Sequence, residues 1–530
     1  GAPRRLAAAA AGGPPPAEGL MTMMRPEVRC FAALEVGFLL VAALAGGRLA
    51  ELLSRRLTRD PKRPVAIPPL LFMLLAGLVL GNLPGGLLRH VSNELSAVLR
   101  KIALTVILLR AGLGLDLAAL REKGSATLRL ASIPCFTEAT VVALMARALL
   151  GMSWGFSFTL GFVVAAVSPA VVVPSLIGLQ DEGYGVAKGI PTMVLAAASV
   201  DDVLAIAAFG VALGVAFSAE GIHANGERST GLLVGIAFVQ IFGGILLGFL
   251  LGRLLGLIRA GPGTGMEPME DGQRESRLRV LLPDNLRHSN HYGIVMSTLR
   301  FTCLVAFGLV MVFASSQYGA AGGGYLACMV IGATAAPLWN TVGDEAVALH
   351  PKGVDAAFTT KGVSGWVGLA WFFLQPMLFS LIGASIQLAD IEGGTVGLGI
   401  VVLLVALAAR IGVTFLAVGG AGLERYERLF VALAWLPKAT VQAAIGSEAL
   451  DVAHREDAND EVTGWGEDIL TIAVLSILLT APLGALLIAY TGRNWLEKKE
   501  EALARPSDSG ASVAPAVGED EGSAVARRAP

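Results

Sequence analysis

The sequence predicts an all-α polytopic membrane protein with about 13 transmembrane helices. Of its 530 residues, 54% are hydrophobic and only 15% are charged, whereas a soluble protein of this length carries roughly 25% charged residues. Apolar runs recur along most of the chain, and many reach the roughly 20 residues that a helix needs to cross a bilayer.

The overall composition also excludes several functions. A net charge of −2 leaves no basic excess for binding nucleic acid. No nucleotide-binding motif is present, so the sequence gives no sign that ATP is used. We expect neither an enzymatic activity nor a cofactor. The four cysteines lie within or beside apolar segments without disulfide spacing, and we expect them to be reduced packing residues: Cys30, Cys135, Cys303 and Cys328.

Thirteen apolar segments follow one another between two polar tails. They run approximately over 29–53, 65–82, 98–116, 125–150, 154–178, 187–218, 228–258, 293–317, 320–338, 363–389, 393–420, 427–449 and 467–491. Residues 1–28 are rich in Ala, Gly and Pro and are expected to be a flexible tail or part of a targeting segment. Residues 493–530 are expected to be a disordered cytosolic tail.

Basic residues concentrate in one set of the connecting loops, which the positive-inside rule places in the cytosol. These loops carry Arg55, Arg56, Arg59, Lys62, Arg63, Arg121, Lys123, Lys188, Arg259, Arg274, Arg277, Arg279, Arg287, Lys352, Lys361, Arg425 and Arg428. The opposite loops carry only Arg89, Arg228 and Arg455. An odd number of crossings then predicts a cytosolic C-terminus and an N-terminus outside. No address selects the plasma membrane over an organelle membrane.

Two segments, seven apart in the series, are interrupted by proline beside a polar residue. The fifth contains Ser168 and Pro169, and the twelfth contains Pro437 and Lys438. Proline frees backbone carbonyls, and irregular backbone at membrane depth is tolerated only where protein or a cavity satisfies it. Although a single kink is common in membrane helices, corresponding broken helices in two halves of a chain indicate a transporter's binding site.

Five ionisable residues fall near the middle of apolar segments: Glu138, Asp201, Asp202, Arg410 and Lys438. A charge at the bilayer centre costs at least about 2.5–3.5 kcal/mol, so each is a functional candidate. Three acids and two bases leave one negative charge, which fits one monovalent cation or one proton. Carboxylate, hydroxyl and carbonyl oxygens suit a hard cation such as Na⁺.

The consecutive carboxylates Asp201 and Asp202 point about 100° apart on a helix. One can therefore bind the ion while the other meets a fixed counter-charge. Arg410 and Glu138 are expected to form a permanent structural pair, separate from the transport site. Lys438 is expected either to neutralise the freed carbonyls of the broken helices or to pair with an Asp and release its proton.

Several strings around these residues resemble the NHA-type Na⁺/H⁺ antiporters, the sodium/hydrogen exchanger 9B group of the cation:proton antiporter superfamily. They are RAGLGLD (Arg110 to Asp116), VSPAVVVPS (Val167 to Ser175), DDVLAI (Asp201 to Ile206), LQPMLFSLIGA (Leu374 to Ala384) and WLPKATVQAAIGS (Trp435 to Ser447). The resemblance spans most of the chain between the two tails.

This resemblance implies an NhaA-like inverted repeat, in which two broken helices cross within a core domain. We expect the antiporter domain over 29–492, with core helices at about 98–218 and 363–491 and dimerisation helices at about 29–82 and 228–317. It implies crossing at Ser168–Pro169 and Pro437–Lys438, and makes Asp202 the principal Na⁺ or Li⁺ and proton carrier. It matches Glu138 and Arg410 to the group's intramembrane acid–base pair. Some animal members have an additional N-terminal span, for which residues 1–28 show no counterpart.

The leading hypothesis is therefore a homodimeric antiporter that exchanges Na⁺ (or Li⁺) for H⁺ by an elevator-type movement of the core. Alternatives of other classes are a cation-coupled organic-solute carrier of similar fold, and a membrane sensor or scaffold. The sequence leaves open whether one or two protons move per cation, and whether Na⁺, Li⁺ or K⁺ is preferred.

Overall fold

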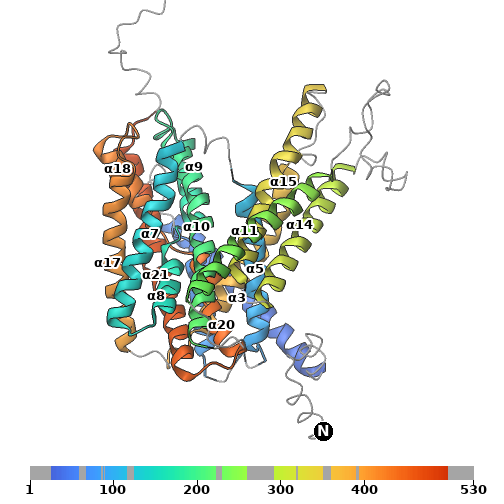
Figure 1. Ribbon diagram of the computed structural model, residues 1–530. Helices are drawn as coiled ribbons and strands as arrows, with labels where there is room; N and C mark the ends of the chain where they lie inside the picture. The colour runs from blue at the N-terminus through green and yellow to red at the C-terminus, as the bar shows by residue number, and fades with distance from the viewer. Residues whose placement is uncertain are drawn as a thin grey trace, which may run out of the picture.

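The computed structural model is almost entirely α-helical in the residues it describes (Figure 1), which are 26–58, 67–84, 87–88, 90–115, 124–221, 230–258, 292–317, 320–349, 360–389 and 393–498. Most of the predicted tails, the loop at 259–291 and Asp116 lie outside these ranges. The first helix begins at Pro26 and the last continues to Trp495, so both extend a few residues into the predicted tails. In the final turn of the last helix, Arg493 Nε donates to Glu182 Oε2 at 2.8 Å.

The helices follow the chain in this order: α3 (Pro26–Leu57), α4 (Pro69–Asn82), α5 (Asn93–Leu113), α7 (Gly124–Leu149), α8 (Trp154–Ala165), α9 (Pro169–Asp181), α10 (Ile190–Ala219), α11 (Thr230–Gly256), α14 (Tyr292–Gln317), α15 (Ala321–Leu349), α16 (Thr360–Ser385), α17 (Gly393–Ala417), α18 (Arg425–Ala434), α19 (Thr440–Ile445), α20 (Glu448–Arg455) and α21 (Asp460–Trp495).

Within the described residues, ten helical stretches are long and apolar enough to cross a membrane, counting α8 and α9 together as one. The other three predicted segments also contain helices, but these do not meet that measure. Helix α4 has only 14 residues, α5 carries Arg100, Lys101 and Arg110, and the segment at 427–449 is divided into short helices. The polytopic helical class is thus confirmed, while the number of 13 crossings stays a prediction.

Local sequence explains where the helices near the broken segments begin and end. Helix α9 starts at Pro169, a residue that suits the first helical turn because it lacks an N–H. Helix α10 starts after Gly189, whose φ of 63° lies in the left-handed region that glycine adopts without strain. At the opposite end of the bundle, the side chain of Asn459 accepts from the backbone N–H of Val462 and caps α21.

The helices pack in two groups, which lie side by side, on the left and on the right, in Figure 1. We call α7, α8, α9, α10, α17, α18 and α21 the first group, and α3, α4, α5, α11, α14, α15 and α16 the second group. Helices α19 and α20 pack on α21 of the first group and also contact α5 of the second. The groups meet where α10 crosses α15, and there Gly210 lies directly against the backbone of Gly322.

Helices α5 and α16, which lie within the predicted core segments at 98–218 and 363–491, pack in the second group. Helix α16 lies against α4, where Gly77 faces the backbone of Ser380 and Gly383 faces that of Leu74. Helix α5 lies against α15 in the same close manner. Small residues allow such backbone approach between membrane helices. Which helices pack together therefore depends on small-residue faces that match between two helices, and the order of segments along the chain does not show which faces match. The predicted dimerisation segments at 29–82 and 228–317 all fall in the second group.

Candidate functional site

Two interrupted helices cross in the middle of the first group. Between α8 and α9 the chain is extended at Ala166 and Ser168, and between α18 and α19 it runs through residues 435–439. The backbone N–H of Ser168 donates to the carbonyl of Pro437 at 2.8 Å, which joins the two interruptions directly. The backbone N–H of Lys438 donates to Thr480 Oγ1 on α21, also at 2.8 Å. Both breaks thus lie at the residues that the proline pattern indicated.

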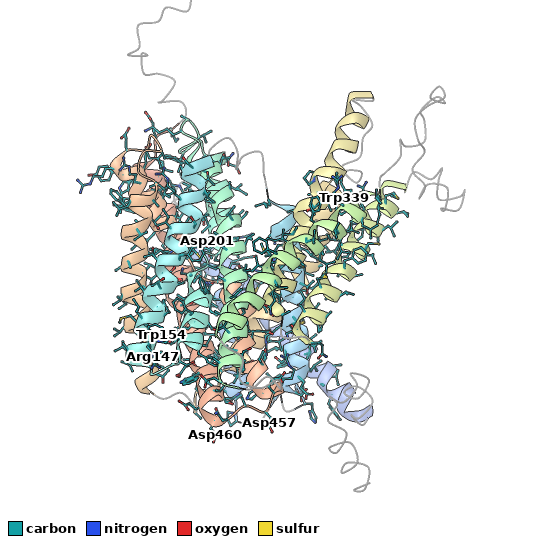
Figure 2. All side chains as sticks on the ribbon, in the orientation of Figure 1. Arg147, Trp154, Asp201, Trp339, Asp457 and Asp460 are labelled. Carbon is teal, nitrogen blue, oxygen red and sulfur yellow. The ribbon has the colours of Figure 1, made fainter. Side chains whose placement is uncertain are left out.

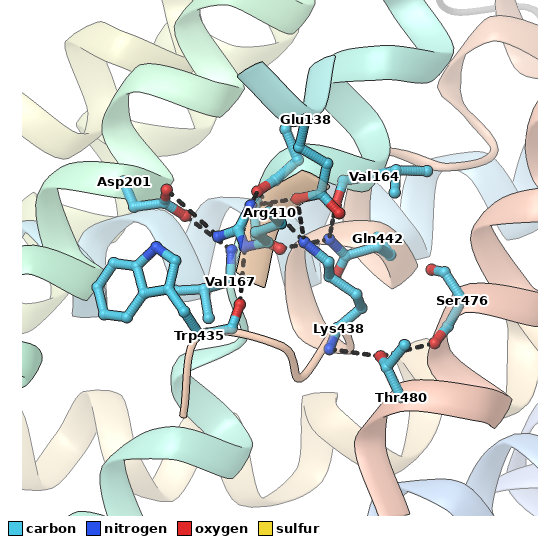
Figure 3. Close-up of polar contacts among 12 residues, drawn as sticks. Glu138, Val164, Val167, Asp201, Arg410, Trp435, Lys438, Gln442, Ser476 and Thr480 are labelled. Atoms are coloured by element: carbon cyan, nitrogen blue, oxygen red, sulfur yellow. Dashed lines mark hydrogen bonds and ion pairs between the residues drawn. The ribbon is translucent and has the colours of Figure 1, made fainter. Parts of the chain in front are cut away.

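The freed carbonyls at the end of α8 are bonded by side chains from other helices (Figure 3). Gln442 Nε2 donates to the carbonyls of Ala166, at 2.8 Å, and Val163, at 3.1 Å. The carbonyl of Ala165 accepts from Arg410 Nη1. Because a buried unpaired carbonyl is costly, these donors stabilise the interruption. Gln442 lies within the string WLPKATVQAAIGS, but the sequence alone did not indicate a role for it.

The remaining end, that of α18, is bonded in the same way. Arg410 Nε donates to the carbonyl of Trp435 at 2.7 Å. A single guanidinium on α17 therefore bonds the C-terminal ends of both α8 and α18. Cations are favoured at such ends by the helix dipole as well as by the hydrogen bonds. Arg410 is completely buried.

Glu138 on α7 lies between the two buried cations. Its Oε2 accepts from Arg410 Nη1 and lies 2.7 Å from Lys438 Nζ, and all three side chains are fully buried. The expected Glu138–Arg410 pair is present, and Lys438 joins it. Lys438 Nζ also donates to the carbonyl of Ala165 at 3.4 Å, which is one of the two roles expected for it. Lys438 pairs with Glu138 rather than with Asp201 or Asp202, because the break in α18–α19 places its ammonium beside α7.

Asp201 connects this cluster to the consecutive carboxylates on α10. Its Oδ2 accepts from the backbone N–H of Val167 at 2.7 Å, and its Oδ1 lies 3.6 Å from Arg410 Nη2. Figure 3 shows the carboxylate directed at the guanidinium from the side opposite Lys438. Asp201 is therefore the acid that meets a fixed counter-charge, and Arg410 contacts both Glu138 and Asp201.

Asp202 has a different environment although it is the next residue. It is 3% exposed, and its Oδ1 has no hydrogen-bond partner among the parts of the chain that the structure describes. Consecutive residues on a helix point about 100° apart, so Asp202 does not share the contacts of its neighbour. If all five groups are ionised, Glu138, Asp201 and Asp202 against Arg410 and Lys438 leave one negative charge in the cluster.

Two hydroxyl groups complete the region of the crossing. Ser168 Oγ lies 3.5 Å from Thr440 Oγ1, and both residues are buried. Pro169 forms the first turn of α9 immediately beyond Ser168. Neither Thr440 nor Thr480 was predicted to have a role. Thr440 follows the proline break closely in the sequence, whereas Thr480 lies far from it, on α21.

A helical membrane protein in which two interrupted helices cross beside buried acids and bases has the architecture of a secondary active transporter. The solved structure of the sodium proton antiporter MjNhaP1 from Methanocaldococcus jannaschii at pH 8 has the same fold. Its TM-score is 0.61, with 17% identity over 87% of this chain and 97% of that one.

Sequence comparison identifies the family. Residues 39–262 match the model of the sodium/hydrogen exchanger transmembrane family. Sodium/hydrogen exchanger 9B2 of Mus musculus is 39% identical over 467 residues, which cover 87% of this chain and 73% of that protein. Sodium/hydrogen exchanger 9B1 of Homo sapiens is 36% identical, covering 86% of this chain and 77% of that protein. The chain belongs to the sodium/hydrogen exchanger family.

Proposed function

We propose that this protein is a secondary active antiporter that exchanges Na⁺ (or Li⁺) for H⁺ at Asp202. One observation carries the proposal: a buried carboxylate with a free oxygen lies in the middle of α10, beside two crossing broken helices. A free carboxylate at membrane depth is costly and needs a cation or a proton. The names of the relatives, which are exchangers of these two ions, support the choice of ions.

Exchange follows from competition for the same oxygen atoms. When Na⁺ is bound, the negative charge of the cluster is neutralised by the cation, and when Na⁺ leaves, a proton on Asp202 neutralises it. Hard cations prefer carboxylate and hydroxyl oxygens, which Asp202, Ser168 and Thr440 supply in this region. Asp201 acts as the coupled partner of Asp202, since its own carboxylate is held by Val167 and Arg410.

The cluster of Glu138, Arg410 and Lys438 keeps the crossing of the broken helices rigid while Na⁺ and H⁺ exchange at Asp202. Glu138, Arg410 and Lys438 satisfy one another and the ends of α8 and α18. If Lys438 stays protonated and paired with Glu138 throughout the cycle, one proton moves per cation and transport is electroneutral. If Lys438 also releases a proton, two move and transport is electrogenic. Flux measured in sealed vesicles under an imposed voltage separates the two.

Alternating access is proposed to occur by an elevator-type movement of the first group against the second. Asp202 and Ser168 lie within the first group, and Thr440 lies on α19, which packs on α21 of that group, so these helices can carry the ion site as a unit. Helices of the second group, with many exposed apolar residues such as Leu34, Phe38 and Val41 on α3, are proposed to face lipid and a second copy in a homodimer. The C-terminus is proposed to be cytosolic.

Purified protein in proteoliposomes with an internal pH-sensitive dye tests the proposed function. Na⁺ added outside the proteoliposomes should produce proton efflux from their interior. Li⁺ is tested in parallel, and choline serves as the inactive cation. An absence of cation-dependent proton flux, together with Na⁺-dependent uptake of a labelled organic anion, would favour the solute carrier instead.

A further inference from the structure

A second buried charge cluster lies away from Asp202, at the contact between α5 and α20. Arg100 Nη2 lies 2.6 Å from Asp451 Oδ1, and Lys101 Nζ lies 2.9 Å from Glu448 Oε1. The four side chains are at most 10% exposed. The two acids are three residues apart and therefore share one face of α20.

These two ion pairs connect the two groups of helices. Arg100 and Lys101 belong to α5 of the second group, whereas α20 packs on α21 of the first. The cations are also bonded to hydroxyls of their own group. Arg100 Nη1 lies 3.1 Å from Ser385 Oγ, and Lys101 Nζ lies 3.3 Å from Ser316 Oγ. The bases are thus anchored in one group and the acids in the other.

A cavity of about 640 Å³ adjoins this contact between the groups. The residues that line it include Arg100, Ser385, Asp451, Asp460 and Glu467. Figure 2 shows Asp460 at the end of the bundle where α20 lies, with Asp201 near the middle of the bundle. Water in the cavity can hydrate both partners of a separated ion pair, which makes separation far less costly than in a dry interior.

We propose that Arg100–Asp451 and Lys101–Glu448 form an ionic latch that closes one side of the transport pathway and must open in every exchange cycle. The proposal rests on the proposed exchange function and adds the residues that resist movement between the two groups. While both pairs are formed, α20 is fixed to α5 and the ion site is closed toward the cavity. Movement of the first group separates the acids from the bases and exposes them to water.

Reversible cross-linking tests this latch in the full-length protein reconstituted in liposomes. In a parent lacking native cysteines, Lys101→Cys is combined with Glu448→Cys, and the two thiols are joined by a short bifunctional methanethiosulfonate. The matched control combines the same Lys101→Cys with Ser316→Cys, which lies in the second group together with residue 101. Arg100→Cys with Asp451→Cys, controlled by Arg100→Cys with Ser385→Cys, repeats the test in case one pair does not fold.

Cross-linking between the groups should lower Na⁺-dependent proton flux at least tenfold, and dithiothreitol should restore it. Cross-linking within the second group should leave flux unchanged. Full flux after a complete cross-link between α5 and α20 would overturn the latch. Absence of exchange in the cysteine-free parent would instead overturn the proposed function, so the two failures are distinguishable.

Discussion

Lys438 Nζ lies 2.7 Å from Glu138 Oε2, so the lysine at the broken helix is paired with an acid on α7. This contact joins residues 300 positions apart in the chain. It places the ammonium with Arg410 around one carboxylate and leaves Asp202 with a free oxygen.

Replacing Lys438 should lower the stability of the protein markedly. Lys438→Met removes one partner of a buried ion pair, a change that typically costs about 3–5 kcal/mol. Because Arg410 still contacts Glu138, we expect a loss toward the lower end of that range. Thermal unfolding in detergent measures it. Arg48→Met removes an exposed arginine that pairs with the exposed Glu51 one turn away, and it should cost only roughly 0–1 kcal/mol. Equal effects of the two changes would contradict the buried pairing.

Glu138 and Lys438 should show strong energetic coupling. Glu138→Gln alone leaves Lys438 without its carboxylate partner, whereas Arg410 keeps its contact with Asp201. Adding Lys438→Met removes the uncompensated charge. The double variant should therefore be more stable than the sum of the single changes predicts, by about 0.5–3 kcal/mol. A double-mutant cycle of unfolding free energies gives this value, and strict additivity would show that the two groups do not interact.

Gln442→Leu should weaken the interruption between α8 and α9. The variant keeps a similar volume but removes the donor to the carbonyls of Ala166 and Val163. Leaving buried carbonyls unpaired costs about 1–3 kcal/mol, and exchange should slow because the crossing loses its fixed geometry. Gln180→Leu, at an exposed position in α9, is the control for stability and flux. Unchanged flux and melting temperature in Gln442→Leu would argue against a capping role.

Glu182 should stabilise the end of α21 at neutral pH and lose this effect in acid. Its hydrogen bonds to Arg493 are the main cause of a pKa below the ordinary value. A lowered folded-state pKa means that the stabilisation is present above the unfolded-state pKa and disappears as pH falls through the folded-state value. The free energies of unfolding of wild type and Glu182→Gln should therefore differ by less than about 1 kcal/mol at pH 7, because solvent screens the pair. The two values should converge in acid. Unfolding curves at both pH values test this, and a gap that widens in acid would have the wrong sign.

Much of the site was predictable because charge is rare in apolar segments. Glu138, Asp201, Asp202, Arg410 and Lys438 stand out in sequence, since burying a charge in a membrane needs a reason. Proline likewise marked the two breaks. Each of these signals lies in a single residue and its immediate neighbours.

The parts that could not be predicted depend on contacts between distant segments. Nothing in the sequence fixes whether Lys438 turns toward α7 or toward α10, and this decided the pairing with Glu138. The assignment of α5 and α16 to the second group depends on glycine surfaces such as Gly77 and Gly383, which gain meaning only when the partner helix is known. Arg100 and Lys101 were missed for the same reason, because their partners lie on α20.

Asp201 and Asp202 should differ in what their substitution does to exchange. Asp201→Asn can still accept from Val167 but no longer offers a charge to Arg410. Hydrogen bonds to charged groups contribute about 1.5–3 kcal/mol, so we expect flux to fall about tenfold or more while remaining measurable. The KM for Na⁺ should rise. Flux equal to that of wild type would contradict the proposed role of Asp201 as a coupled partner.

Na⁺-dependent proton flux through Asp202→Asn in proteoliposomes tests most directly whether Asp202 is the carrier. Asparagine keeps the size of the side chain but carries neither the negative charge nor the exchangeable proton. We expect flux equal to that of empty liposomes, from protein that remains folded by gel filtration and thermal unfolding. Asp181→Asn, at an exposed position in α9, should keep wild-type flux. Sustained exchange by Asp202→Asn would contradict the assignment of Asp202 as the carrier.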